Sequence, residues 1–325
     1  MRYPLISIII PCFNRERLVA DAIESALRQS YSNFEIIVVD DGSSDESWSV
    51  ISSYKPKVVA IRSENQGVSA ARNKGIAAAS GDYIVFLDSD DLFETTALCS
   101  YVKALNQYEH TFDDKMRTVL VGKCRTIDDN GKLTFGGVYR IPNRFDFKRL
   151  DELQIVSAWA PNYGSFFPKS LLAAINCYDE RLYIGEDYDL NVRIIDNGGV
   201  FFPIASYTYR VRVHDGPRLT RRISREGYYN CLEVFRSAWE KHRVNFQLKH
   251  NEESRIRFAQ WVWSMGRSAY RAGETEVGNR FIHLALEIAG KEAWNGSRVV
   301  RFMYQYLAPS SVERLVSLKS CYDKF

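Results

Sequence analysis

The most constraining feature of this sequence is the alternation of four short apolar runs with helix-like segments in roughly its first ninety residues. The runs are rich in β-branched residues and lie at Leu5–Ile10, Phe34–Val39, Val58–Ile61 and Tyr83–Leu87. Each predicts a strand buried on both faces, as in a parallel sheet. Between them, Arg15–Gln29 and Gly67–Ala79 place apolar residues at helical spacing. The alternation predicts stacked βαβ units, and hence an α/β fold with a mostly parallel sheet flanked by helices.

The rest of the chain predicts a less regular middle and a helical end. Residues 117–140 hold two strand-like runs around a turn at Asp128–Gly131, and helices are predicted over Lys169–Ala174 and Glu186–Asp196. After His214 the helical pattern is nearly continuous, which predicts two domains, 1–214 and 215–325. The predicted helices of the second domain cover about 225–242, 252–272, 275–290 and 296–319. Part of this region resembles a single tetratricopeptide-type helix pair.

Charge is divided unevenly between these two parts. Residues 1–214 carry a net charge of −4 and residues 215–325 a net charge of +7, within a total of +3 for 325 residues. The acidic part is therefore expected to hold a metal ion, and the basic part to face an anionic surface. The small total charge does not indicate a nucleic-acid partner.

Cysteine spacing and hydropathy bear on the compartment. None of the six cysteines belongs to a CxxC pair, which favours free thiols in a reducing compartment over a disulfide framework. The N-terminal segment lacks the features of a signal peptide, and no run approaches the roughly 18 apolar residues of a membrane span. We expect a cytoplasmic protein, with a peripheral position at the inner face of the cell membrane left open.

Polar residues follow three of the four predicted strands, at the edge where parallel sheets bind ligands. These residues are Phe13-Asn14, Asp40-Asp41 and Asp88-Ser89-Asp90-Asp91. A single aspartate in such a place is as often a turn former or a helix cap. Three clusters at one edge indicate a shared site. Asp88 and Asp90 supply two carboxylates for Mn²⁺ or Mg²⁺, leaving positions open for diphosphate oxygens, on which the ion would act as a Lewis acid.

The residues after the first strand exclude two common nucleotide sites. Pro11-Cys12-Phe13-Asn14 stands where a dinucleotide site has GxGxxG and a phosphate-binding loop has GxxxxGK[ST]. A phosphatase with a nucleophilic aspartate is disfavoured too, because its paired aspartates would follow the first strand.

Five segments together resemble the inverting family 2 glycosyltransferases, which have the GT-A fold, a Rossmann-like arrangement. They occur in the family's order within residues 5–214, and they are Ser7–Asn14, Phe34–Asp45, Asn65–Gly75, Gly81–Asp91 and Gly185–Leu190. The pair Cys12-Phe13 departs from the family's usual aliphatic or small residue followed by Tyr, but it keeps the aromatic ring.

The resemblance implies a role for each matching position. It implies a nucleobase pocket lined by Pro11, Phe13 and Asp41, with Asp88 at the ribose, Asp90 as the principal metal ligand and Asp187 as the general base. Further nucleotide-binding residues would be Asn14, Asn65, Gly67, Arg72 and Ser89. Glu186 would complete the catalytic pair, and Asp88 and His214 the metal site.

Asp187 also fits the base role on chemical grounds. In-line displacement at an anomeric carbon needs a carboxylate to take the acceptor proton on the side opposite the departing diphosphate. The alternative is an N-cap of the predicted helix 186–196. We favour the base, because Gly185 leaves the backbone free to approach a ligand.

The remaining candidates each have a structural alternative. His214 is a metal or diphosphate ligand or a structural histidine. Trp159 and Gly164 lie where the family receives sugar and acceptor, but the neighbouring Phe166-Phe167 pair fits a core equally well. The arginines of the 210–222 region contact phosphate or form a solvated basic face. In the helical domain, basic and aromatic residues such as Trp261, Trp263 and Arg267 pack in the core, touch a membrane or form a homodimer.

The sequence thus predicts a metal-dependent hexosyl- or N-acetylhexosaminyltransferase. Its donor would be a nucleotide-sugar, with a UDP-sugar favoured, and its acceptor a glycan or lipid-linked glycan in cell-surface polysaccharide synthesis. Two alternatives stay open: a catalytically silent sugar-nucleotide or glycan-binding module, and a sugar-1-phosphate nucleotidyltransferase. The second would carry a loop rich in glycine and arginine after the first strand, and that loop is absent.

Overall fold

The computed structural model describes residues 3–107, 115–134, 162–213 and 223–294, together with residues 304, 311 and 312. These described residues form two compact units, one before residue 214 and one after residue 222. The predicted boundary at 214/215 lies outside the described residues, as does the predicted helix 296–319 apart from three of its positions.

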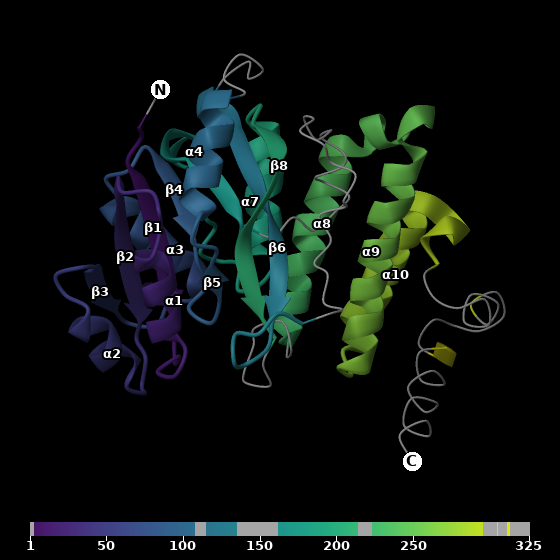
Figure 1. Ribbon diagram of the computed structural model, residues 1–325. Helices are drawn as coiled ribbons and strands as arrows, with labels where there is room; N and C mark the ends of the chain where they lie inside the picture. The colour runs from purple at the N-terminus through teal and green to yellow at the C-terminus, as the bar shows by residue number, and fades with distance from the viewer. Residues whose placement is uncertain are drawn as a thin grey trace. The chain divides into compact units, whose positions relative to one another are not determined.

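The first unit contains an eight-stranded mixed sheet in the order β3-β2-β1-β4-β7-β6-β8-β5 (Figure 1). Its strands are β1 (Ile6–Cys12), β2 (Phe34–Asp41), β3 (Val59–Ser63), β4 (Tyr83–Phe86), β5 (Leu92–Phe93), β6 (Thr118–Ile127), β7 (Ser165–Pro168) and β8 (Val200–Arg212). The predicted α/β class with a mostly parallel sheet is confirmed: β1 to β4 are mutually parallel, as are β6 and β8, whereas β7 and β5 pair antiparallel with their neighbours.

The helices of this unit follow the strands as the alternation predicted. They are α1 (Val19–Leu27), α2 (Ser47–Ser53), α3 (Val68–Ala78), α4 (Ala97–Gln107), α6 (Lys169–Ala174) and α7 (Glu186–Asp196). Every residue of β1 is buried, which explains why it reads as one continuous apolar run. The large core cluster joins β1, β2 and β4 to α1 and α4.

Helix α3 packs unusually close to the sheet. A Cβ atom built on Gly75 would lie 2.4 Å from the Cγ2 of Ile9 on β1, so only glycine permits this approach. Ala70, Ala71 and Ile76 complete the buried face of the helix. The same face carries Arg72, which is 5% exposed, and its guanidinium lies over the ring of Phe86 at the end of β4 and pairs with Asp88.

The second unit is helical, as predicted, with α8 (Arg225–Phe246), α9 (Glu252–Arg271) and α10 (Thr275–Ala289). Helices α9 and α10 lie side by side (Figure 1). They approach closely at two glycines: a Cβ on Gly266 would lie 3.2 Å from the carbonyl oxygen of Gly278. Trp263 is buried in the core, whereas Trp261 is half-buried and meets Phe235 of α8 edge to face at 4.4 Å.

The described ranges also bear on disulfides and on membrane-spanning helices. The five cysteines that they include form no disulfide. None of the helices described has both the length and the apolar character that crossing a membrane requires.

Candidate active site

The loops after β1 and β2 are joined by side-chain hydrogen bonds. Asn14, whose φ of 51° is left-handed, donates its backbone N–H to Ser43 Oγ at 2.9 Å. Its side-chain oxygen accepts the backbone N–H of Ser44, also at 2.9 Å. The side chain that the sequence assigns to nucleotide binding therefore also fixes the loops to each other.

Two neighbouring candidates on β1 differ in exposure. Pro11 is buried within β1 and lies opposite Val39 of β2, whereas the Phe13 side chain beyond the strand end is 44% exposed. An aromatic ring this exposed at a ligand-binding edge is free to stack on a planar group.

Asp41 organises the loop that leads into α3. Its Oδ1 accepts the N–H of Gln66 at 3.0 Å and its Oδ2 accepts the N–H of Gly67 at 2.8 Å. The residue is 3% exposed. Asp41 thus holds Asn65 and Gly67, two other predicted nucleotide-binding residues, against the end of β2, and each of its oxygens keeps a second lone pair for a ligand.

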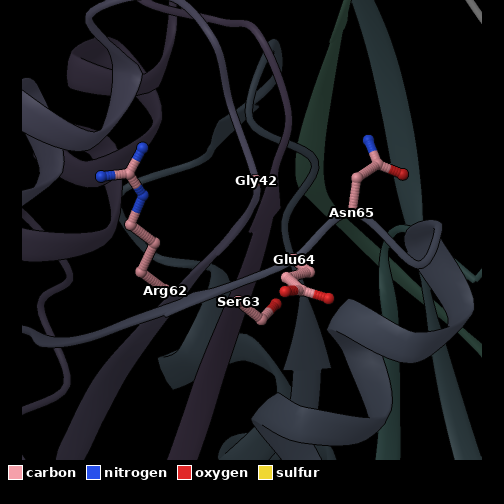
Figure 2. Close-up of a pocket in the computed structure, with 5 residues that line it drawn as sticks. All are labelled: Gly42, Arg62, Ser63, Glu64 and Asn65. Atoms are coloured by element: carbon pink, nitrogen blue, oxygen red, sulfur yellow. The ribbon is translucent and has the colours of Figure 1, made fainter.

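A hollow of about 550 Å³, open to solvent, lies beside the ends of β2 and β3. This volume falls within the roughly 300–1,000 Å³ typical of small-ligand pockets. Figure 2 shows the residues that line it: Gly42, Arg62, Ser63, Glu64 and Asn65. A Cβ on Gly42 would lie 2.7 Å from the backbone nitrogen of Asn65, so this wall of the hollow requires glycine.

Only Asn65 of these five was predicted as a site residue. Arg62, Ser63 and Glu64 end and follow the third strand, and they form a polar strand end like the three that the sequence singled out. The same signal could therefore have found them. Ser63 Oγ is buried and has no hydrogen-bond partner among the described residues, and Arg62 Nε lies 3.3 Å from Asp40 Oδ2.

The acidic cluster after β4 is held by three arginines. Asp88 Oδ1 pairs with Arg72 Nη2 at 3.2 Å, and Asp90 Oδ2 with Arg15 Nε at 3.4 Å. Asp91 Oδ1 accepts the backbone N–H of Arg212 at 2.7 Å. Burial, followed by the charges of Asp90 and Asp187, raises the pKa of Asp88 in spite of Arg72. Burial thus disfavours the charged form of Asp88 even though Arg72 is its ion-pair partner.

Arg212 corrects one sequence-based alternative. It is 2% exposed, so it belongs to neither a solvated basic face nor a free phosphate site. Its Nε donates to the backbone carbonyl of Asp90 at 3.1 Å and its Nη2 to Asp21 Oδ2 at 2.9 Å. Arg210, also in that basic group, pairs with Glu94 at 2.6 Å. Both arginines are engaged inside the protein, and Arg212 fixes the backbone of the acidic cluster.

Arg72 connects this cluster to the start of α7. Its Nη1 lies 3.0 Å from Glu186 Oε1 and 3.2 Å from Asp187 Oδ1, while its Nη2 reaches Asp88. The guanidinium also lies over the ring of Tyr178 at 5.1 Å. One buried cation therefore joins three carboxylates from two distant parts of the chain.

The start of α7 places Glu186 and Asp187 inside the protein. Gly185 is the N-cap, with a left-handed φ of 85°, and no side chain caps the helix. Asp187 therefore does not act as the N-cap, which was the alternative reading of this position. Burial, followed by the charge of Asp187, raises the pKa of Glu186 to about 7.

Asn162 is a site residue that the sequence did not single out. Its side-chain Nδ2 donates to Asp187 Oδ1 and to Tyr178 Oη, both at 2.9 Å. It is 1% exposed. No motif marks a lone asparagine within an aromatic segment, so only the fold reveals that it contacts Asp187.

Gly164 has its contacts in the sheet and in α4, not in the acidic cluster. Gly164 is buried at the start of β7, and its carbonyl oxygen accepts the N–H of Gly122 and the hydroxyl of Tyr101, each at 2.7 Å. Phe166 and Phe167 are fully buried, which settles their place in favour of the core. Trp159 and His214 lie outside the described residues. Ser89 is buried.

The donor set fits a hard divalent cation bound together with a substrate. No cluster of three or more His, Cys, Asp or Glu side chains arranged to hold a metal occurs in the portion of the chain described above. Mg²⁺, however, is commonly held by one or two carboxylates plus substrate phosphates. Asp88 and Asp90 supply two carboxylates at a strand end. Burial and, after it, the charge of Asp90 raise the pKa of Asp88, and a bound cation would relieve the repulsion between the two carboxylates.

Comparison with known proteins gives a consistent family. Residues 7–171 match the model of Glycosyl transferase family 2. An uncharacterized glycosyltransferase of Rickettsia typhi is 31% identical over 238 residues, 73% of this chain and 70% of the relative. Glycosyltransferase GlyA of Streptococcus pneumoniae is 26% identical over 64% of this chain but only 30% of its own length. The minor teichoic acid biosynthesis protein GgaB of Bacillus subtilis is 28% identical over 79% of this chain and 28% of its own length.

Among solved structures, the fold matches that of residues 1–349 of TarS from S. aureus in complex with UDP-GlcNAc. The TM-score is 0.62 at 19% sequence identity, and the match covers 92% of this chain and 91% of that chain. The same TarS fragment in complex with UDP matches with a TM-score of 0.56 at 20% identity.

Proposed function

This chain belongs to the family 2 glycosyltransferases, and we propose that it transfers a sugar from a UDP-sugar to a hydroxyl group of a glycan or lipid-linked glycan, with inversion at the anomeric carbon. The observation that carries the proposal is the convergence of Asp88, Glu186 and Asp187 on the buried guanidinium of Arg72. The acidic strand end and the start of α7 thereby form one site at the ligand-binding edge of the sheet.

The nucleoside would bind beside the ends of β1, β2 and β3. The exposed ring of Phe13 offers a face for the base, and the hollow at Gly42, Ser63 and Asn65 offers polar groups for base and ribose. The TarS fragment that shares this fold binds UDP-GlcNAc, which supports a UDP-sugar as the donor and a hexosyl or N-acetylhexosaminyl group as the cargo.

The diphosphate would lie against Asp88 and Asp90 through a divalent cation. A bound Mn²⁺ or Mg²⁺ would supply Lewis acidity there, neutralising the charge on the departing diphosphate. Arg72 keeps Asp88 in place through its 3.2 Å pair. Arg212 fixes the backbone of Asp90 through the bond to its carbonyl oxygen.

Asp187 would accept the proton of the attacking hydroxyl. The acceptor oxygen forms a bond to the anomeric carbon as the bond from that carbon to the diphosphate breaks. The electron pair leaves with UDP and the proton passes to the Asp187 carboxylate. Attack from the side opposite the leaving group inverts the configuration in a single step, so no covalent enzyme intermediate is needed.

The likeness to GgaB supports a place in the synthesis of cell-surface polysaccharide. The chain spans less than a third of the length of GgaB and of GlyA. The match therefore does not extend to the remaining parts of these two proteins.

The proposal is tested first by binding and then by turnover. Thermal stabilisation of the wild type by a panel of UDP-, GDP- and dTDP-sugars with Mn²⁺ identifies the donor, because ligand binding to the folded state raises its stability. We expect a UDP-sugar to stabilise most. UDP release from that donor is then compared in the wild type, Asp187→Asn and Asp189→Asn. Asp189 is a matched control in the same helical turn, where it pairs with Arg193 at 2.6 Å.

Asp187→Asn should abolish UDP release while nucleotide binding stays nearly intact, and Asp189→Asn should stay close to the wild type. Binding of a sugar nucleotide without turnover by the wild type would identify a silent binding module instead. Full activity of Asp187→Asn would remove Asp187 from the base role.

A further inference from the structure

The two oxygens of the Asp187 carboxylate are held very differently. Oδ1 accepts the Asn162 Nδ2 at 2.9 Å and the Arg72 Nη1 at 3.2 Å. Among the described residues, Oδ2 receives only the backbone N–H of Asn162, at 3.4 Å. That distance is beyond the 2.7–3.2 Å usual for an N–H···O bond, so Oδ2 is only weakly engaged.

We propose that Asn162 is the positioning residue of the general base, and that its grip on Oδ1 leaves Asp187 Oδ2 as the oxygen that takes the acceptor proton. The inference rests on the proposed function, because it assigns an atom to the base role. Hydrogen bonds to a charged oxygen stabilise its charged form. The oxygen without strong donors is therefore the better proton acceptor. Protonation at Oδ2 also leaves both bonds at Oδ1 in place.

The orientation of the Asn162 amide follows from its two partners. Nδ2 uses both hydrogens, one to Asp187 Oδ1 and one to Tyr178 Oη. Exchange of the amide oxygen and nitrogen would put two acceptors, the amide oxygen and the carboxylate, 2.9 Å apart. The nitrogen therefore faces Asp187. Tyr178 completes the clamp from the other side, and it is itself buried.

The backbone of Asn162 is fixed by the sheet. Its carbonyl oxygen accepts the N–H of Ser165, the first residue of β7, at 3.2 Å. Gly164, between them, bonds β6 through Gly122 and α4 through Tyr101. These hydrogen bonds fix the turn to β6 and β7, and they thereby fix the position of the Asn162 amide that holds Asp187. A side chain on α7 is thus oriented by a residue outside its own helix.

One atom of Asn162 is not satisfied inside the protein. Its Oδ1 is buried and has no hydrogen-bond partner among the described residues. A buried acceptor without a partner costs free energy. The side chain nevertheless keeps this orientation, because its nitrogen serves Asp187 and Tyr178 together. The clamp is therefore maintained at a cost, as is common for groups that serve a site.

The test measures UDP release from the donor chosen in the thermal-shift panel. Asn162→Ala removes the clamp, and Tyr178→Phe removes only its far end while keeping the aromatic ring beside Arg72. Asn73→Ala is the matched control. The side-chain amide of Asn73 makes three hydrogen bonds at 2.9 Å: it accepts the backbone N–H of Tyr178 and donates to the Tyr178 carbonyl and to Glu180 Oε1. No contact between Asn73 and Asp187 is found in the described structure.

We expect Asn162→Ala to lower kcat about 10- to 100-fold, because misplacement of a reacting group by about 1 Å can cost 10²-fold. The KM for the donor should change less than about twofold, since the nucleotide site is untouched. Tyr178→Phe should lower kcat about 3- to 10-fold. The double variant should lose no more than Asn162→Ala alone, because both changes break one clamp.

The Asn73→Ala control distinguishes a loss of kcat caused by misplacement of Asp187 from one caused by lower stability of the fold. Asn73→Ala should lower the Tm by a few degrees without the selective loss of kcat. Equal kcat values for wild type and Asn162→Ala, in a protein where Asp187→Asn is inactive, would overturn the positioning role alone. An active Asp187→Asn variant would instead overturn the proposed function. If Asn162→Ala does not fold, Tyr178→Phe decides: an unchanged kcat refutes the clamp.

Discussion

The guanidinium of Arg72 lies 3.2 Å from the carboxylate of Asp187, although 115 residues separate the two in the sequence. The same cation pairs with Glu186 and Asp88. Burial in α3 and these three carboxylates make Arg72 the charge centre of the site. Without it, three carboxylates would face one another with no cation between them, two of them with side chains only 12% and 10% exposed.

Replacement of this cation should therefore destabilise the fold strongly. We expect Arg72→Met to lower the free energy of unfolding by about 3–5 kcal/mol, the usual cost of removing one partner of a buried ion pair. The deficit should shrink at pH 5, where Glu186, whose pKa is about 7, is protonated and no longer repels its neighbours. Urea denaturation at pH 5 and pH 8 measures both effects.

Arg28→Met provides the control. Arg28 is 61% exposed and pairs with Glu24 one turn away in sequence, so its loss should cost no more than about 0.5 kcal/mol. Similar losses for Arg72→Met and Arg28→Met would show that the buried cation does not organise the site.

The raised pKa of Glu186 predicts a pH dependence of stability. Its pKa is about 7 in the folded protein and 4.5 ordinarily, because burial and Asp187 disfavour the charged form. The folded state therefore keeps a proton that the unfolded state has lost between these values. This contribution to stability is complete below pH 4.5 and is lost as the pH rises through 7. It is on the order of 3 kcal/mol.

Glu186→Gln tests this dependence, because an amide resembles the protonated acid at every pH. The variant should gain stability relative to the wild type at pH 8 and lose that advantage at pH 5, as measured by urea denaturation. Parallel stability curves for the two proteins across this range would mean that Glu186 is ionised throughout.

Substitution of Gly42 should affect both the stability of the fold and the binding of UDP. Its φ is +73°, and an added Cβ would lie 2.7 Å from the backbone nitrogen of Asn65. Gly42→Ala should therefore combine backbone strain with a clash and cost about 2–4 kcal/mol. It should also displace the wall of the hollow at Asn65 and weaken UDP binding at least about tenfold in calorimetry with Mn²⁺.

Gly131→Ala isolates the strain. Gly131 has a similar φ of +78°, but nothing lies within 4 Å of its added Cβ. We expect a cost of about 1–2 kcal/mol and unchanged UDP affinity. Equal UDP affinity in both variants would argue that the hollow does not bind the nucleotide.

The sequence predicted the first half of the fold well, because strands buried on both faces appear in the sequence as continuous apolar runs. Every residue of β1 and β4 is buried, so those strands read as unbroken apolar runs. Strand β8 was harder to find. It runs for 13 residues through Pro203 and an exposed stretch at 205–207, and its pairing with β6 is irregular. Neither strand nor helix spacing persists through such a segment.

The site residues that stand in short sequence motifs were predictable. Those that reach the site through contacts distant in the sequence were not. Asp88, Asp90, Glu186 and Asp187 stand in short acidic patterns that can be read directly. Asn162 is assigned to the site only by its hydrogen bonds to Tyr178 and Asp187, which lie 16 and 25 residues away in the sequence. Arg212 looked like a surface cation because its partners, the exposed carboxylate of Asp21 and the backbone carbonyl of Asp90, come from other elements.

Asp90 provides the sharpest test of metal binding. Its carboxylate is 18% exposed and pairs with Arg15 at a long 3.4 Å, so it can exchange that partner for a cation. Wild-type affinity for UDP should fall at least about tenfold when Mn²⁺ is replaced by EDTA, because the cation bridges the protein to the diphosphate. In Asp90→Ala the two affinities should agree within about twofold.

Asp82→Ala serves as the control, since Asp82 precedes β4 at the opposite end of the strand and accepts a hydrogen bond from the Leu5 N–H. It should keep the wild-type response. If Asp90→Ala still responds to EDTA as the wild type does, the cation is held elsewhere and the two-carboxylate site is wrong.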